Sequence, residues 1–75
     1  MGDKSGNDKA KEVLGRNLKK FRTDANMSIR ALATAALTSP SQIDRIERGE
    51  VNTSVSTIFA LAEALGIKPA QLLDE

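Results

Sequence analysis

One stretch near the middle of the chain carries side chains whose types and spacing suit recognition of a polar or anionic partner. The stretch has polar or charged residues and one proline at the spacing i, i+1, i+4, i+5 and i+8, which places them on one stripe of a helix: Pro40, Ser41, Asp44, Arg45 and Arg48. A guanidinium presents a planar fork of donors, so it can bind a pair of acceptors with two parallel hydrogen bonds. This stripe is therefore the candidate binding surface.

The composition excludes other kinds of chemistry. The 75 residues include no Cys and no His, which removes disulfides, thiolate nucleophiles, the usual imidazole base and His-ligated metals. The carboxylates are not set in apolar surroundings that would raise a pKa, so we expect no enzyme, no cofactor and no metal. No apolar run approaches the roughly 20 residues that cross a bilayer, and no secretory signal is recognisable. We expect a cytoplasmic protein that binds a partner.

Charge is distributed unevenly along the chain, although the net charge is only +1. Residues 1–30 hold eight Lys and Arg against four Asp and Glu, whereas residues 31–75 hold three against six. This asymmetry favours an anionic partner for the first half of the chain. Length allows one small domain. Residues 1–8 are polar and Gly-containing and are predicted to form a flexible tail, and residues 9–75 are predicted to form the domain.

The hydrophobic periodicity predicts an all-α fold of five short helices. Apolar residues recur at helical spacing, and no segment shows the alternation of a strand. Ser28, Ser39 and either Thr53 or Ser54 are placed to cap helices, and Gln42 is placed to complete a capping box with Ser39. Together with Gly and Pro positions, these signals predict helices over residues 8–25, 29–36, 40–48, 54–65 and 69–73.

The apolar faces of these helices form the predicted core. Gly15 interrupts the first helix and is expected to loosen its early turns. The residues expected to face inward are Leu14, Leu18, Phe21, Leu32, Ala33, Ala36, Ile43, Ile46, Val55, Ile58, Leu61, Ala62 and Leu65.

Two neighbouring helices are too short and too closely joined to pack antiparallel along their length. Only Leu37 and Thr38 separate the helix at 29–36 from the helix at 40–48, so the two must cross steeply, as in a helix-turn-helix. The second of these helices then lies outermost and can enter a DNA major groove. Arg45 there can bind guanine O6 and N7, while Ser41 can hydrogen-bond to several bases.

The segment SIRALATAALTSPSQIDRIERGEVNTSVSTIFALAEALGIKPAQLL resembles the lambda-repressor-like, Cro-type helix-turn-helix domain, also known as the xenobiotic-response-element type. The resemblance covers roughly residues 14–73. Its most specific parts are Leu32-Ala33, the run from Ile43 to Gly49, and the run from Leu61 to Gly66. The family implies dimeric binding to pseudo-palindromic double-stranded DNA, with the third helix reading bases.

The resemblance assigns roles to individual residues. It places base contacts at Ser39, Pro40, Ser41, Asp44 and Arg45. It places contacts with the DNA backbone at Ser28, Ile29, Arg48, Asn52 and Thr53, to which Arg16 and Lys19 are added from their charge and position. It also implies a buried ion pair between Arg22 and Glu47 that holds the third helix at a fixed angle. A dimer surface is expected on Leu72, Leu73 and the outer part of the fourth helix.

The chain departs from the family pattern at several positions. Ile29 stands where the family often has Gln, and Thr53 stands where many relatives have Pro. Leu37 replaces the usual turn Gly, so the turn must either avoid a positive φ or adopt it under strain. Asp44 and Glu50 place negative charge beside the expected DNA, where Asp44 can accept from cytosine N4 or penalise wrong sites.

Other interpretations of the same residues remain open. Arg45 and Arg48 can be a solvated helix face with ion-pair partners such as Asp44, and Lys19 can be ordinary charged surface. The serines at the helix starts can act only as caps. The whole domain can be an antitoxin or another protein-interaction module on the same fold, or the N-terminal DNA-binding part of a longer effector-sensing regulator.

Overall fold

The structure, a computed structural model, describes the backbone of residues 4–75 and the side chains of residues 8–75. Five helices occupy this part of the chain, and it contains no strand: α1 (Lys4–Asp24), α2 (Ile29–Ala35), α3 (Pro40–Glu47), α4 (Val55–Leu65) and α5 (Pro69–Leu72). The all-α prediction is therefore confirmed. None of these helices is long and apolar enough to cross a membrane.

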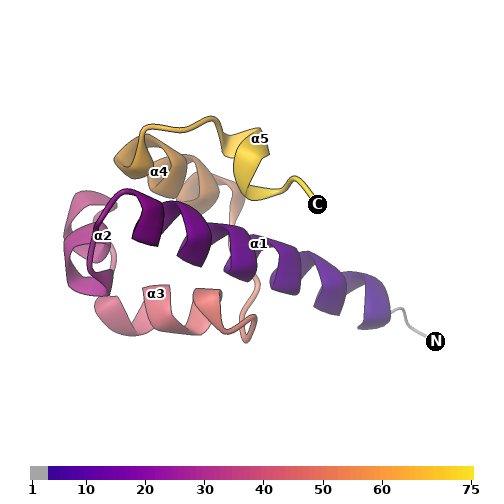
Figure 1. The fold of residues 1–75 in the computed structure, drawn as a ribbon. Coiled ribbons are helices and arrows are strands. Elements are labelled where there is room, and N and C mark those ends of the chain that lie inside the picture. Colours follow the sequence, from indigo (N-terminus) through magenta and orange to yellow (C-terminus); the bar gives the residue numbers. More distant parts are fainter. Residues whose placement is uncertain (1–3) are drawn as a thin grey trace.

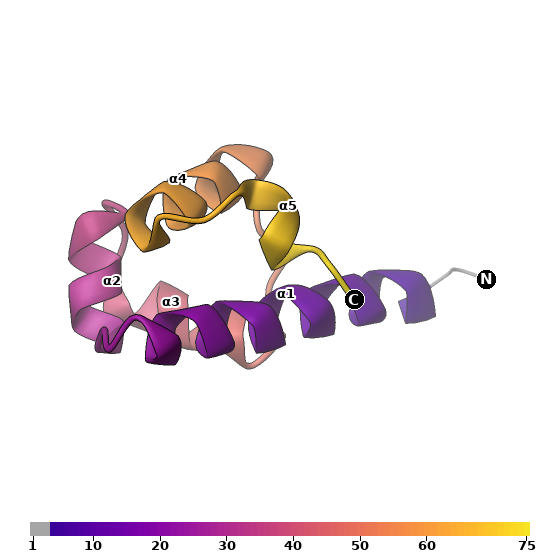
Figure 2. The same ribbon diagram turned by 45° about the horizontal axis from the view of Figure 1, so that its top comes forward.

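The long helix α1 forms the spine against which the other elements are arranged. Figure 1 shows α3 on one side of α1, α4 and α5 on the other side, and α2 closing one end of the molecule. The turned view agrees, with α4 and α5 above α1 and α2 at the same end (Figure 2). The first turns of α1 extend beyond the remaining helices. Because α3 lies at an edge, its outer side is free to contact a partner.

The helix ends follow the chemistry of their capping residues. The Ser28, Ser39 and Ser54 hydroxyls accept hydrogen bonds from the backbone N–H of Ala31, Gln42 and Thr57, at 3.0, 3.1 and 3.1 Å. The fourth helix is thus capped by Ser54 and not by Thr53. At α3 only one half of the expected capping box is present, because the Gln42 side chain makes no return bond to the backbone of Ser39 within the described residues.

The reciprocal bond of that kind occurs instead at α5, where the Lys68 backbone N–H donates to Gln71 Oε1 at 2.9 Å. Left-handed residues follow four of the helices, and at three of these helices the residue is Asn or Gly. Asn26 has a φ of 58°, and Gly49 and Gly66 have φ values of 71° and 72°. These are the residue types that adopt this region most readily, as the sequence predicted.

Helix α1 begins earlier than expected. The sequence placed its start near Asp8, after a tail over residues 1–8, whereas residues 4–8 belong to the helix. Residues 1–3 of the predicted tail lie outside the described residues. Residues 4–8 are KSGND, in which only Lys is a good helix former, so helix propensity does not account for this extension.

All five helices contribute residues to the core. It consists of Val13, Leu14, Leu18, Leu32, Ala33, Ala36, Ile43, Ile46, Ile58, Leu61, Ala62 and Leu72. Most of the predicted core is present, with Phe21 and Leu65 packed at its edge. Two predictions are wrong, since Val55, expected in the core, is 70% exposed and Leu72, expected at a dimer surface, is fully buried. Val55 is the first residue of α4, where the helix has not yet reached the core.

The turn between α2 and α3 adopts the strained alternative. Leu37 has a φ of 60°, and its side chain is 93% exposed. The left-handed region brings the Cβ of a non-glycine residue close to its own backbone, at a cost of about 1–2 kcal/mol. Its exposed side chain gains almost no burial in return. The steep crossing of α2 and α3 therefore includes local strain at this residue.

Candidate nucleic-acid interface

The outer face of α3 presents the residues that the sequence assigned to base reading. Ser39, Pro40, Ser41 and Arg45 are exposed, and the side chain of Asp44 is 48% exposed. Ile43 and Ile46 point the other way and are buried, which fixes the rotation of the helix about its axis. Within residues 8–75 Arg45 forms no ion pair, so its guanidinium is free to bind an external acceptor.

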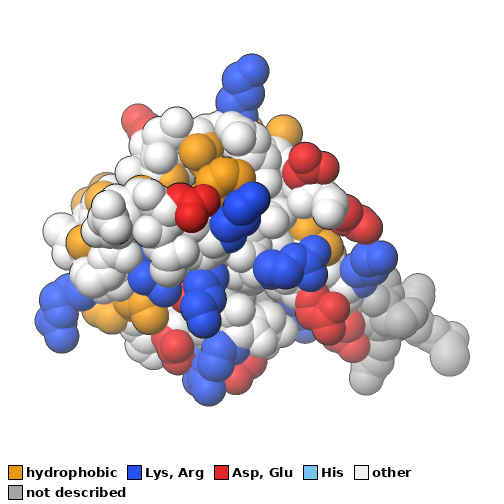
Figure 3. Space-filling model, in the orientation of Figure 1, with side chains coloured by type: hydrophobic (Ala, Val, Ile, Leu, Met, Phe, Trp, Pro, Cys, Tyr) orange, Lys and Arg blue, Asp and Glu red, His pale blue; other side chains and the backbone are white. Residues whose placement is uncertain are grey.

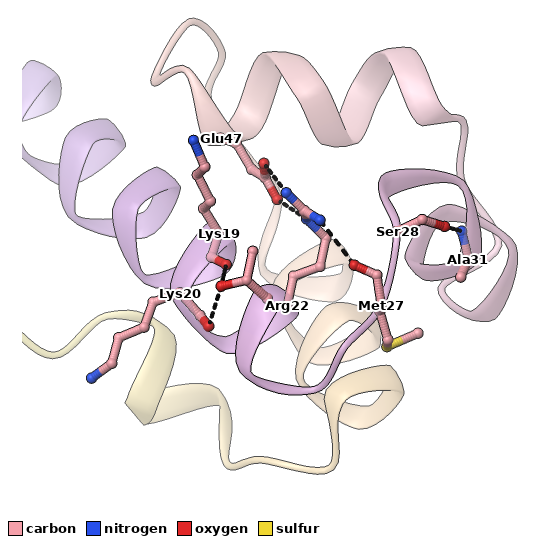
Figure 4. A network of polar contacts seen from close by, with 8 residues as sticks. Lys19, Lys20, Arg22, Met27, Ser28, Ala31 and Glu47 are labelled. Carbon is pink, nitrogen blue, oxygen red and sulfur yellow. Dashed lines mark hydrogen bonds and ion pairs between the residues drawn. The ribbon is translucent and has the colours of Figure 1, made fainter.

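An ion pair fixes α3 to α1. Arg22 Nε donates to Glu47 Oε2 at 2.6 Å and Arg22 Nη2 donates to Glu47 Oε1 at 3.1 Å, while Nη1 donates to the Met27 carbonyl at 2.9 Å (Figure 4). The two side chains are only 11% and 6% exposed. The hydrogen bond to Glu47 raises the pKa of Arg22, against the lowering effect of burial, and the charge of Glu47 adds to the rise.

The pair expected from the resemblance is therefore present, and its bidentate geometry restricts the angle between the two helices. Because Arg22 also binds the carbonyl of Met27, just before α2, the same side chain connects α1, α3 and the entry to the helix-turn-helix. The pair therefore fixes the orientation of α3 relative to α1.

A glycine lets α1 and α3 approach closely. A Cβ atom at Gly15 would lie 2.6 Å from the carbonyl oxygen of Ile46 and 2.7 Å from that of Glu47. Real Cβ atoms do not come so near to backbone oxygens. Gly15 was interpreted as a weak point of the helix, but the structure gives it a packing role. Its place beside the apolar residues Leu14 and Leu18 was the signal available in the sequence.

Of the residues predicted to contact the DNA backbone near α2, some are exposed and one is packed against the core. The Ser28 hydroxyl caps α2 and lies at the surface. Ile29 packs its side chain against the core, so only its backbone faces the start of the helix. Arg16 and Lys19 are exposed on α1. Figure 4 shows Lys19 directed toward the side of α1 on which Glu47 lies, whereas Lys20 is directed away from it.

The residues after α3 are more varied. Arg48 pairs with Asp44 and Glu50, and Asn52 is exposed. The hydroxyl oxygen of Thr53 is buried and has no hydrogen-bond partner in the described structure. Thr53 and Asn52 line a cavity of about 120 Å³ whose other walls come from α1, Val51, Ile58 and Leu73. The hydroxyl group of Thr53 is therefore turned into the molecule and is not available to an external ligand.

The charged surface is a mixture of signs. On the face that carries α1, Lys and Arg side chains lie among Asp and Glu, and no large area has a single sign (Figure 3). Sequence analysis did not identify Asn17, whose side-chain amide donates to the carbonyls of Leu72 and Asp74 at 2.9 Å each. These bonds attach the C-terminal segment to α1. A lone Asn in a helix gave no signal for a contact so distant in sequence.

The sequence profile of the helix-turn-helix family matches residues 18–72. The chain therefore belongs to this lambda-repressor-like helix-turn-helix family, as the resemblance suggested, and membership supports a role in DNA-binding transcription regulation.

Individual relatives agree with the family match. Control protein C.SmaI of Serratia marcescens is 35% identical over 63 residues, which cover 84% of this chain and 75% of that protein. The crystal structure of the restriction-modification controller protein C.AhdI from Aeromonas hydrophila is similar with a TM-score of 0.81 and 34% identity, covering 83% of this chain and 94% of that one. The clp gene regulator ClgR from C. glutamicum has the same TM-score and identity, covering 85% and 83%.

Proposed function

We propose that this helix-turn-helix protein is a transcription repressor that binds double-stranded DNA by inserting α3 into the major groove. The observation that carries the proposal is the free outer face of α3, on a helix that a nearly buried ion pair fixes in place. A helix with its side chains is about 10–12 Å across, and the major groove of B-DNA is about 12 Å wide. A small domain bound there prevents other proteins from occupying the same DNA.

The exposed groups of α3 suggest a division of roles at the bases. Arg45, which forms no ion pair within residues 8–75, has a guanidinium that matches guanine O6 and N7. Ser41 can donate or accept, and Pro40 offers apolar contact to a thymine methyl group. Asp44 can accept from cytosine N4. Ser39 lies beside these residues, with its oxygen accepting the capping bond and its hydroxyl hydrogen free to donate.

The DNA backbone is proposed to contact both ends of the helix-turn-helix. At one end the Ser28 hydroxyl and the backbone of Ile29 face a phosphate at the start of α2, with Arg16 and Lys19 supplying positive charge from α1. At the other end the contacts come from Arg48, Asn52 and the backbone of Thr53. These contacts position α3 and carry no sequence information themselves.

A homodimer is part of the proposal. Val55 and Phe59 are 70% and 58% exposed on α4, and Leu73 is 51% exposed after α5. Leu72, which was expected at this surface, is fully buried and belongs to the core. A second copy covering the three exposed side chains would place two α3 helices on half-sites about one helical turn apart. We assign the chain no enzymatic activity.

The test is selection of duplexes from a randomised DNA library by the full chain at about 0.15 M salt. The proposal expects a two-fold symmetric consensus. A chain that selects no sequence but forms a salt-insensitive protein complex would instead favour the protein-interaction alternative, which the mixed surface charge also permits.

The dimer is tested separately by sedimentation equilibrium. Phe59→Asp is expected to shift the chain toward monomer. Leu37→Asp is the matched control, because it places the same charge on an exposed apolar residue in the turn between α2 and α3. An equal effect of both variants would contradict the proposed dimer surface.

A further inference from the structure

Arg45 and Arg48, the two arginines at the C-terminal end of α3, differ in their surroundings. Arg48 Nη2 lies 3.1 Å from Asp44 Oδ2, and Arg48 Nε lies 3.5 Å from Glu50 Oε2. Arg45 has no such partner within residues 8–75. The side chains of Arg48, Asp44 and Glu50 are 59%, 48% and 45% exposed, so all three can reach a ligand at the surface. The arginine expected at a phosphate is thus already held by two carboxylates.

These contacts leave the DNA-facing side of α3 without net positive charge. Glu47 is turned inward to Arg22, so the outer side carries Arg45 and Arg48 against Asp44 and Glu50. Sequence-independent affinity for DNA comes almost entirely from cations that neutralise phosphates. An arginine that is already paired with carboxylates on the protein does not neutralise a phosphate, so its binding releases few counterions from DNA. Random DNA should therefore bind this face weakly.

Asp44 lies at the point where base reading and phosphate binding meet. It occupies one of the positions assigned to base contact, and it is also the nearer partner of Arg48. A carboxylate at the major-groove edge can accept from the amino group of cytosine. If Asp44 turns to a base, Arg48 loses its closest partner and its guanidinium becomes available to a phosphate.

We propose that Asp44 couples the two contacts: it holds Arg48 on unsuitable DNA and releases it to a phosphate where cytosine satisfies the carboxylate. This inference depends on the proposed function, because it assigns a specificity mechanism to the same surface. The exchange is energetically accessible, since an exposed ion pair changes an equilibrium by at most about fivefold. A well-formed base contact contributes about fivefold to a hundredfold in discrimination. Glu50 keeps a second, longer contact with Arg48 and limits its freedom in the absence of DNA.

The experiment uses the duplex that the wild-type chain selects, the same duplex with each C·G pair replaced in turn, and a scrambled duplex. Dissociation constants are measured by fluorescence anisotropy over a range of salt concentrations. For Asp44→Asn we expect scrambled DNA to bind about fivefold more tightly. We also expect the preference for cytosine at one position of each half-site to fall by about tenfold. Glu63→Gln removes a charge from an exposed residue of α4 and controls for net charge alone.

A second variant distinguishes coupling from simple repulsion. On the selected duplex, the logarithm of the binding constant falls linearly with the logarithm of the salt concentration. Arg48→Gln is expected to make this slope shallower by about 0.9, the contribution of one phosphate contact. On scrambled DNA its slope should remain that of the wild type, because Arg48 is not released there.

If Arg48→Gln changes the salt slope equally on both duplexes, or if Asp44→Asn and Glu63→Gln change the dissociation constants equally, the coupling is overturned while the proposed DNA binding stands. A wild-type chain that selects no duplex would overturn the proposed function, and the coupling with it.

Discussion

Gly15 gives the sharpest test of how α3 is positioned against α1. Replacing a helical Gly by Ala ordinarily stabilises a helix by about 1 kcal/mol. Here the new methyl group would lie 2.6 Å and 2.7 Å from two carbonyl oxygens of α3. Both neighbours are backbone atoms, so relief requires α3 to move away from α1. Overpacking of this kind costs about 1–3 kcal/mol, occasionally more.

The contact with two backbone oxygens places Gly15→Ala at the upper end of that range, so we expect a net loss of about 2 kcal/mol after the gain in helix propensity. For a domain of this size the melting temperature should fall by roughly 10 °C. The assay is urea and thermal unfolding followed by circular dichroism. Lys19→Gly, on an exposed position of α1, measures the propensity effect in the same helix. A Gly15→Ala chain more stable than the wild type would refute the close approach of α1 and α3.

Further substitutions test other parts of the structure. Leu37→Gly should raise the unfolding free energy by about 0.5–1 kcal/mol, because relief of left-handed strain exceeds the added freedom of the unfolded chain; a loss of stability in urea would contradict the strain. Glu47→Ala leaves Arg22 nearly buried without its carboxylate and should cost about 3 kcal/mol, whereas the double variant Arg22→Met with Glu47→Met should recover much of that loss. Folding raises the pKa of Arg22, which is already high, so the guanidinium stays charged and its stabilising contribution is complete at neutral and mildly alkaline pH; this contribution is lost only at strongly alkaline pH. The stability lost in Arg22→Met should therefore be the same at about pH 6 and about pH 9. Asn17→Ala removes two hydrogen bonds to the C-terminal segment and should lower stability by about 1 kcal/mol, with faster amide exchange confined to α5 and its neighbours.

Much of the fold was predictable because local chemistry and global packing agree. Ser28 and Ser39 cap the two helices of the helix-turn-helix, and Gly49 follows α3 in the left-handed region. The apolar residues Ile43 and Ile46 then fix which side of α3 faces outward. These signals act within a few residues of each other, so a sequence pattern can reveal them.

The remaining features depend on contacts between distant segments. The role of Gly15 depends on where the carbonyls of α3 lie, and that of Asn17 on where the chain ends. The buried hydroxyl of Thr53 depends on how the loop after α3 packs. Leu37 was recognised as a departure, but only the structure shows that the turn keeps a positive φ with a branched side chain. The hydrophobic periodicity of the sequence cannot predict contacts of this kind.

The same limit applies to the candidate site. The exposed stripe on α3 follows from helical spacing, and the Arg22–Glu47 pair follows from the family resemblance. The division between a free Arg45 and a paired Arg48 does not follow from either, because Asp44 is compatible with several partners until the side chains are placed.

The central claim, that Arg45 reads guanine from the major groove, is tested most directly by methylation interference. Methylation of guanine N7 blocks the groove edge that a bidentate arginine would contact. On the selected duplex, methylation of one guanine in each half-site should prevent binding of the wild-type chain and have no further effect on Arg45→Ala. Binding that tolerates methylation at every guanine, or an unchanged interference pattern in Arg45→Ala, would contradict the claim.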